Sequence, residues 1–102
     1  ETSSDHDHED FDSFVLTLEG DQLEQAFLTK LNNVIVEHDV LRIKGFINIT
    51  DKPMRLAIQA VGTRIETYFD RYWPQGSERH SKLVVIGKAG LEKDLISKIL
   101  TI

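Results

Sequence analysis

The sequence predicts an α+β domain, a two-layer sandwich in which a mainly antiparallel sheet of four to five strands carries two helices on one face. Apolar and polar side chains alternate through residues 40–50 and again through 54–60, which is the pattern of half-buried strands. Apolar side chains recur instead at helical spacing in residues 21–37 and after Gly90. Two helices that each have a single apolar face need a sheet to bury it against.

The bulk composition fits one folded domain and excludes several classes of protein. The chain has 102 residues, of which 40% are hydrophobic and 28% charged, with a formal net charge of -5. The acidic balance disfavours nucleic-acid binding, and no apolar run approaches the ~20 residues that a membrane span requires. The absence of cysteine excludes disulfides, thiolate zinc sites and cysteine nucleophiles. Because the chain begins with Glu and has no secretory signal, we expect a domain excised from a cytoplasmic protein.

The first part of the chain predicts a tail, a strand and a helix. Residues 1–10 contain no apolar side chain and are expected to form a disordered acidic linker, with the folded domain at 11–102. Alternation from Phe11 predicts a strand that Gly20 ends. Asp21 and Glu24 have the spacing of a capping box, so a helix should begin at Asp21 and end near residue 38. Its buried face is expected to consist of Leu23, Phe27, Leu31, Val34 and Ile35.

The second part predicts a hairpin, a central strand and a second helix. Residues 40–50 and 54–60 form strands joined by the turn at 51–53, and Gly62 bends the chain so that residues 64–69 look like a continuation of the second strand. A polar loop at 70–81 precedes the nearly all-apolar strand 82–87, which is typical of the middle of a sheet. The last helix is expected to bury Leu91, Leu95, Ile96 and Ile99. The order β-α-β-β-(β)-β-α is similar to that of ferredoxin-like folds.

Four stretches, in order, carry a resemblance to a known family. Residues 40–46 contain an Arg-x-Lys-Gly strand, residues 56–62 end in Gln-Ala-Val-Gly, Trp73 is followed by proline, and residues 82–87 lead to a Gly-Leu pair. Together they resemble the C-terminal domain of the CobW-like family of P-loop GTPase metal chaperones. The resemblance covers nearly all of the chain after residue 10.

The resemblance implies that GTP binding and hydrolysis, and a cysteine-containing metal motif, belong to a separate N-terminal domain. This chain has no Gly-x-x-x-x-Gly-Lys-Ser/Thr loop, and the Gly-Lys-Ala-Gly of residues 87–90 has the wrong spacing, so we expect a plain strand-to-helix turn there. The implied role is a non-catalytic, regulatory or client-binding domain of a GTP-dependent metallochaperone. Its metal would be cobalt for cobalamin synthesis, or zinc. The alternative is a free-standing ferredoxin-like module that binds a small ligand or associates with itself.

The tail contains the candidate metal ligands. His6 and His8 stand among Asp5 and Asp7, and imidazoles with carboxylates suit zinc, cobalt or nickel. Nothing preorganises these groups, so any binding should be weak and exchangeable, and no cofactor is expected to be tightly bound. The competing interpretation is a solvated linker. The resemblance favours metal binding, since CobW-like proteins often carry a His-rich linker before this domain.

The candidate interaction surface is the face of the sheet opposite the helices. Arg42, Lys44 and Phe46 share one side of their strand and should lie on that open face. The alternate residues Leu41, Ile43, Ile47 and Ile49 should face the helices, and Gly45 inside the strand suggests a close backbone approach or a bulge. An aromatic ring among cations suits docking of the N-terminal GTPase domain, a metal-receiving client protein or a second copy, although a solvated sheet face would also carry lysine and arginine. Trp73 is either a partner anchor or a lid on the core. The sequence shows no catalytic constellation.

Overall fold

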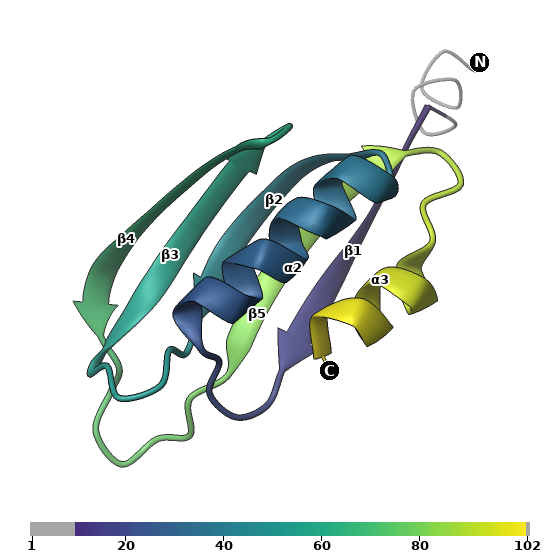
Figure 1. The fold of residues 1–102 in the computed structure, drawn as a ribbon. Coiled ribbons are helices and arrows are strands. Elements are labelled where there is room, and N and C mark those ends of the chain that lie inside the picture. The colour runs from purple at the N-terminus through teal and green to yellow at the C-terminus, as the bar shows by residue number, and fades with distance from the viewer. Residues whose placement is uncertain (1–9, 102) are drawn as a thin grey trace, which may run out of the picture.

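Two helices lie side by side on one face of a five-stranded sheet, and none of the described elements covers the other face (Figure 1). The computed structural model describes residues 10–101. In chain order the elements are β1 (Phe11–Leu18), α2 (Glu24–Glu37), β2 (Val40–Ile47), β3 (Met54–Val61), β4 (Arg64–Tyr72), β5 (Ser81–Lys88) and α3 (Lys93–Thr101). The two-layer α+β architecture and the element order predicted from the sequence are confirmed.

The strand order is β1-β5-β2-β3-β4, and every pair of neighbouring strands is antiparallel. Strand β5 runs antiparallel to both β1 and β2, so β1 and β2 point the same way and α2 connects them across the sheet. This is a split β-α-β unit, extended on one side by the β3–β4 hairpin. The apolar strand at 82–87 therefore lies inside the sheet, as its composition predicted.

The core lies between the sheet and the helices. Its α2 contribution is Phe27, Leu31, Val34 and Ile35, all buried, which confirms that face of the predicted helix. The predicted beginning of α2 is wrong. Helix α2 begins at Glu24, its N-cap is Leu23 without a side-chain cap hydrogen bond, and Leu23 is 66% exposed. The capping box at Asp21 does not form, because Gln22 is held instead in a parallel bridge to Ile49.

Helix α3 buries a set of apolar side chains different from the predicted one. Ile96 and Leu100 are fully buried and Leu91 is nearly so, whereas Leu95 is 42% exposed. Ile99 packs at the edge of the core. The prediction for Leu95 is therefore wrong, and Leu100 takes the core position.

Strand β2 departs from strict alternation at its start. Its register against β5 shifts between Val40 and Arg42, so Leu41 is the extra residue of a bulge. Val40 is buried and Leu41 only half-buried, which corrects the expectation that Leu41 faces the helices. Further along the strand Ile43 and Ile47 are buried as predicted.

Residues 64–72 form a strand of their own and do not continue β3. A tight turn at Gly62 and Thr63 reverses the chain, and β4 pairs with β3 along its whole length. Asp70, Arg71 and Tyr72 belong to this strand, so the predicted polar loop begins three residues later than expected. Strand β4 is an edge strand of the sheet (Figure 1). Among the described residues no helix is long and apolar enough to cross a membrane.

Candidate functional site

The open face of the sheet carries a band of apolar side chains bordered by cations. Strand pairing places Phe46 beside Ala57 on β3 and beside Lys82 on β5, and Tyr68 of β4 lies on the far side of Ala57. One row further along, Lys44 stands between Gln59 and Val84. Because paired residues of antiparallel strands project to the same side, all of these side chains share the open face.

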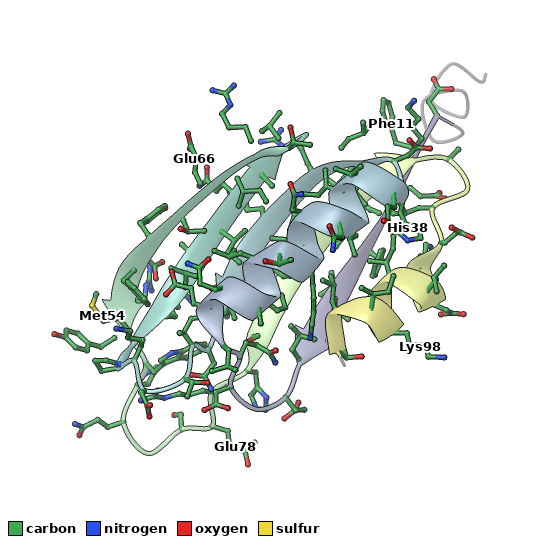
Figure 2. The ribbon with its side chains drawn as sticks, viewed as in Figure 1. Phe11, His38, Met54, Glu66, Glu78 and Lys98 are labelled. Atoms are coloured by element: carbon green, nitrogen blue, oxygen red, sulfur yellow. The ribbon has the colours of Figure 1, made fainter. Side chains whose placement is uncertain are left out.

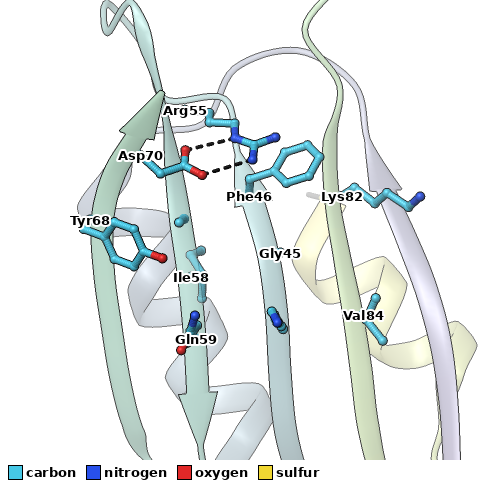
Figure 3. A pocket seen from close by; sticks show the side chains of 11 residues that line it. Gly45, Phe46, Arg55, Ile58, Gln59, Tyr68, Asp70, Lys82 and Val84 are labelled. Atoms are coloured by element: carbon cyan, nitrogen blue, oxygen red, sulfur yellow. Dashed lines mark hydrogen bonds and ion pairs between the residues drawn. The ribbon is translucent and has the colours of Figure 1, made fainter. Parts of the chain in front are cut away.

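An ion pair forms one end of this surface. The Nε and Nη2 atoms of Arg55 donate to the two carboxylate oxygens of Asp70 at 2.9 and 3.0 Å, and both side chains are 20% exposed (Figure 3). The geometry depends on a bulge, since the β3–β4 register shifts at Asp70 and turns its carboxylate toward Arg55. The hydrogen bonds from Arg55 hold the pKa of Asp70 below its ordinary value against the opposing effect of burial, and the charges of Arg55 and Arg71 add to the lowering.

The same guanidinium also covers an aromatic ring. The Cζ atom of Arg55 lies 4.1 Å from the centre of the Phe46 ring, and Trp73 meets that ring edge-on with the ring centres 5.9 Å apart. Asp70, Arg55, Phe46 and Trp73 thus form one continuous stack. Phe46 is half-buried within it, so it is less exposed than the sequence-based expectation of a bare ring implied.

Below the stack the face is hollowed. Ala57 is short, and larger side chains surround it on the neighbouring strands, leaving an open hollow of about 360 Å³ (Figure 3). Lys44 and Lys82 line it together with Arg55 and Asp70. Arg42 lies one row beyond, exposed like both lysines. None of these three exposed cations makes an ion pair with another residue in the described part of the chain, so the hollow has an excess of positive charge.

The structure brings three of the four predicted interface residues together. Phe46 contacts Trp73, and Lys44 lines the hollow beside Phe46. Arg42 shares their strand and face at a greater distance from the hollow. Trp73 is half-buried against Phe46 and does not belong to the helix-side core, so it is not a lid on that core. The indole Nε1 of Trp73 is buried without a hydrogen-bond partner in the described chain.

The predicted tail ligands Asp5, His6, Asp7 and His8 lie outside the described residues. Within residues 10–101 no group of three or more histidines and carboxylates is placed to hold a metal ion. Two histidines of the described chain lie close to carboxylates. The Nδ1 atom of His38, at the end of α2 facing α3, lies 3.1 Å from a Glu92 carboxylate oxygen (Figure 2). His80 lies between Glu19 and Glu78, 3.2 Å from each.

The glycine-rich turn at 87–90 is not a phosphate cradle in this fold. The backbone N–H groups of Gly90 and Leu91 both donate to a carboxylate oxygen of Asp12, and that of Ala89 donates to the Asp10 carbonyl. A carboxylate of the chain itself thus takes the position that a bound phosphate would need. This agrees with the interpretation of the segment as a strand-to-helix turn.

The sequence interpretation missed the Arg55–Asp70 pair because it treated residues 64–69 as a continuation of β3. A signal was present. Once Gly62 and Thr63 are taken as a two-residue hairpin turn, counting back along both strands brings Asp70 level with Arg55, although the bulge makes Arg71 the register partner of Arg55 in the structure. Asn48 and Ser81 were also missed. The buried Ser81 hydroxyl accepts the backbone N–H of Asn48 at 2.8 Å, across 33 residues of sequence with no local signal.

Comparison with known proteins places this geometry in context. The family model described as the cobalamin synthesis protein cobW C-terminal domain matches residues 11–101. The chain is 48% identical, over 99% of its length, to a Sinorhizobium protein named zinc chaperone CobW, and spans 28% of that protein. It is 49% identical, over 64% of its length, to a Pseudomonas aeruginosa protein of the same name, of which it spans 17%.

Solved structures show the same fold. The Zn(II)-bound YjiA GTPase from E. coli superimposes with a TM-score of 0.77 at 26% identity, over 95% of this chain and 30% of that one. A Zn(II)-bound triple mutant of YjiA GTPase also gives 0.77 at 27% identity, over 88% of this chain and 28% of that one. The chain therefore spans less than a third of the relatives and structures that it matches.

Proposed function

The chain belongs to the family of CobW C-terminal domains, and on that basis we propose that it is the non-catalytic C-terminal domain of a GTP-dependent zinc chaperone. The observation that carries the proposal is the 48% identity, over 99% of the chain, to the Sinorhizobium zinc chaperone CobW. GTP binding and hydrolysis would belong to the N-terminal domain of the whole protein, in the cytoplasm. The described residues support this assignment of GTP binding to another domain, because the backbone N–H groups at the glycine-rich turn of residues 87–90 already donate to the Asp12 carboxylate.

Within that protein we propose that the open face of the sheet docks the GTPase domain. In the described chain the face has no covering element, and it combines exposed valines and the half-buried Phe46 with the cations Arg42 and Lys44. Surfaces of this kind, an apolar centre with a charged rim, are typical of protein interfaces. A metal-receiving client protein is the other candidate for the same face, if nucleotide state releases the GTPase domain from it.

Zinc is the cargo that the relatives' name favours, and cobalt for cobalamin synthesis is the second candidate. We propose that residues 1–10 form an acidic linker ahead of the folded domain at 11–102, and that His6, His8, Asp5 and Asp7 bind the cargo weakly. Replacing His6 and His8 with alanine should then lower Zn(II), Co(II) or Ni(II) binding to the chain without changing its thermal stability. Equal metal binding by the variant would show that His6 and His8 do not bind the cargo.

A domain swap tests the function. The segment of the Sinorhizobium zinc chaperone that this chain matches is replaced by this chain, and GTP hydrolysis and Zn(II) transfer to an apo acceptor are measured against the parent protein. The proposal predicts that the chimera keeps both activities, whereas a version lacking the segment loses transfer. A chimera that folds and hydrolyses GTP but transfers no more zinc than the truncated version would refute the chaperone role.

Self-association is a second candidate, favoured by one observation. Val15 and Val61 are each 56% exposed and Val84 37% exposed, all on the open face. Two copies could bury these side chains against each other. Sedimentation equilibrium of the 102-residue chain decides this point, since a monomer at 100 µM (a concentration of about 10⁻⁴ M) leaves no room for a functional homodimer.

A further inference from the structure

Two of the positive charges that line the hollow on the open face have no carboxylate partner in the described part of the chain. Lys44 and Lys82 are diagonal neighbours on β2 and β5, a relation in which residues lie about 7–8 Å apart. Both line the hollow, both are exposed, and neither is paired with a carboxylate in residues 10–101. Two like charges on adjacent strands repel each other weakly in water, and an incoming anion would be attracted to both.

Arg55 contributes a preorganised donor to the same hollow. Its Nε and Nη2 atoms are held by Asp70 and its face lies on Phe46, which fixes the guanidinium plane. The Nη1 atom has no hydrogen-bond partner among the described residues, although Arg55 lines the hollow. A guanidinium held on two sides loses little conformational freedom when its third nitrogen binds an acceptor.

Asp70 does not reverse this preference. Both of its oxygens are engaged by Arg55, and Arg71 lies 3.9 Å from one of them. The pair of Arg55 and Asp70 is neutral as a unit, so Lys44 and Lys82 determine the net sign of the hollow. A cationic group would meet unpaired ammonium charge, whereas a carboxylate would meet the donors of Lys44 and Arg55.

The walls of the hollow determine what kind of anion fits. Tyr68 of β4 and Val84 of β5 stand on opposite sides, with Ala57 at the floor and Phe46 between β3 and β5. Tyr68 is 52% exposed and Val84 37% exposed, so apolar surface borders the charged centre. Such a site suits a carboxylate carried by a protein segment whose neighbouring side chains are apolar, because it offers contact to both. A phosphate backbone would use the cations and leave the apolar rim unpaired.

We propose that this hollow is the receptor for an acidic side chain of the docking partner, whose carboxylate is bound by Lys44 and the free Nη1 of Arg55, while Lys82, whose side chain extends away over β1, adds positive charge at the rim (Figure 3). This inference rests on the proposed docking role of the open face and names the chemistry of the partner segment. Apolar residues on either side of that acidic side chain pack on Tyr68 and Val84. The Arg55–Asp70 pair is a positioning device that keeps the Arg55 donor oriented while the hollow is empty.

The test uses the 102-residue chain and a synthetic probe peptide, Ac-Leu-Glu-Leu-Glu-Tyr-NH2, with its Gln-for-Glu counterpart as the matched control. Trp73 is the only tryptophan and contacts Phe46, so its fluorescence reports occupancy, and amide chemical shifts locate the site. We expect saturable binding of the acidic peptide, with shifts confined to the open face. The Gln peptide should bind at least roughly tenfold more weakly, because it loses charge-assisted hydrogen bonds.

Matched variants distinguish peptide binding at the hollow from a general effect of the net charge of the chain. Replacing Lys44 and Lys82 with Gln should weaken peptide binding at least roughly tenfold and leave the melting temperature unchanged or slightly raised, because it relieves repulsion in the free chain. Replacing Lys93 and Lys98, two exposed lysines on α3 in the helix layer, with Gln changes the net charge by the same two units and should leave binding unchanged (Figure 2). Arg55→Lys keeps the charge but loses the fixed fork, and it should weaken binding as well.

Several outcomes would overturn the inference. Equal binding of the Glu and Gln peptides would show an apolar contact only, and tighter binding of a ten-nucleotide oligothymidylate would show a nucleic-acid surface. A homodimer that depends on Lys44 and Lys82 would identify a second copy as the occupant. If the acidic peptide fails to bind while the GTPase domain still docks on the open face, this inference falls and the proposed function stands. If neither binds, the docking role itself is wrong.

Discussion

Gly45, the glycine of the Arg-x-Lys-Gly strand, offers a direct test of how β2 packs against β5. A Cβ atom added at Gly45 would collide with the Lys82 carbonyl oxygen and would lie 2.8 Å from the Leu83 Cα, where carbon atoms normally approach to about 3.5–4.0 Å. Strand β2 would have to move about 1 Å away from β5, in the middle of the sheet. Overpacking of this kind costs about 1–3 kcal/mol, and each weakened ladder hydrogen bond adds roughly 1 kcal/mol.

Gly45→Ala should therefore lower the free energy of unfolding by about 3 kcal/mol, which corresponds to a fall in melting temperature of roughly 12–24 °C for a domain of this size. Urea unfolding followed by circular dichroism measures it. The matched control is Gly62→Ala in the β3–β4 turn. Its added Cβ meets nothing within 4 Å, so only the left-handed backbone at φ 57° opposes it, at a cost of about 1 kcal/mol. If Gly45→Ala costs no more than Gly62→Ala, the close approach of β2 and β5 is not what selects glycine here.

Three further predictions concern stability, pH and nucleotide. Leu100→Ala should cost about 2–5 kcal/mol because Leu100 is fully buried, whereas Leu95→Ala, at a 42% exposed position, should cost less than about 1 kcal/mol in the same urea assay. Asp70→Asn should lower stability by about 1–2 kcal/mol at pH 7 by weakening the bonds to Arg55. Because the pKa of Asp70 is lowered by folding, its contribution is fully present above the unfolded value and is lost as the pH falls through the folded one. The stability curves of the wild type and Asp70→Asn should therefore converge below pH 3.8, and parallel curves would contradict this. The isolated chain should neither bind nor hydrolyse GTP in equilibrium dialysis, and micromolar binding would refute the assignment of GTP binding to another domain proposed above.

Most of the fold was predictable because an element that buries one face carries apolar residues at regular intervals in the sequence. Phe27, Leu31 and Ile43 stand where the helical and strand periods placed them, and the all-apolar strand at 82–87 is indeed interior. Gly45 was expected to mark a close backbone approach or a bulge, and the structure shows the close approach, to the backbone of Lys82 and Leu83. These features depend on near neighbours in sequence, which a single chain reveals.

The errors arose where tertiary contacts chose between equivalent local patterns. Helix α3 has two overlapping apolar stripes, formed by Leu95, Ile96, Ile99 and Leu100. Only packing against the sheet determines which of the two is buried. Leu23 fits the α2 stripe, but the bridge between Gln22 and Ile49 fixes the chain before the helix and leaves Leu23 outside. Local periodicity carries no information about either choice.

The candidate site was predictable in part. Strand alternation was sufficient to place Arg42, Lys44 and Phe46 on one face. The Arg55–Asp70 pair, which organises that face, could have been found by recognising β4 as a separate strand, but the bulge that makes Arg71 the register partner of Arg55 could not. A bulge adds one residue without a distinctive composition, so its position cannot be deduced from the pattern alone.

The central claim, that the open face of this CobW C-terminal domain docks the GTPase part of the protein, is tested most directly by binding in trans. The 102-residue chain is titrated by calorimetry against the Sinorhizobium zinc chaperone lacking its matching segment, with and without GTP. Arg42→Glu with Lys44→Glu should weaken association at least roughly tenfold, because reversed charges would face the partner's acidic surface. Both side chains are exposed, so the variant should remain folded, with a change within about 0.5 kcal/mol per site. Undiminished binding by the folded double variant would contradict the account.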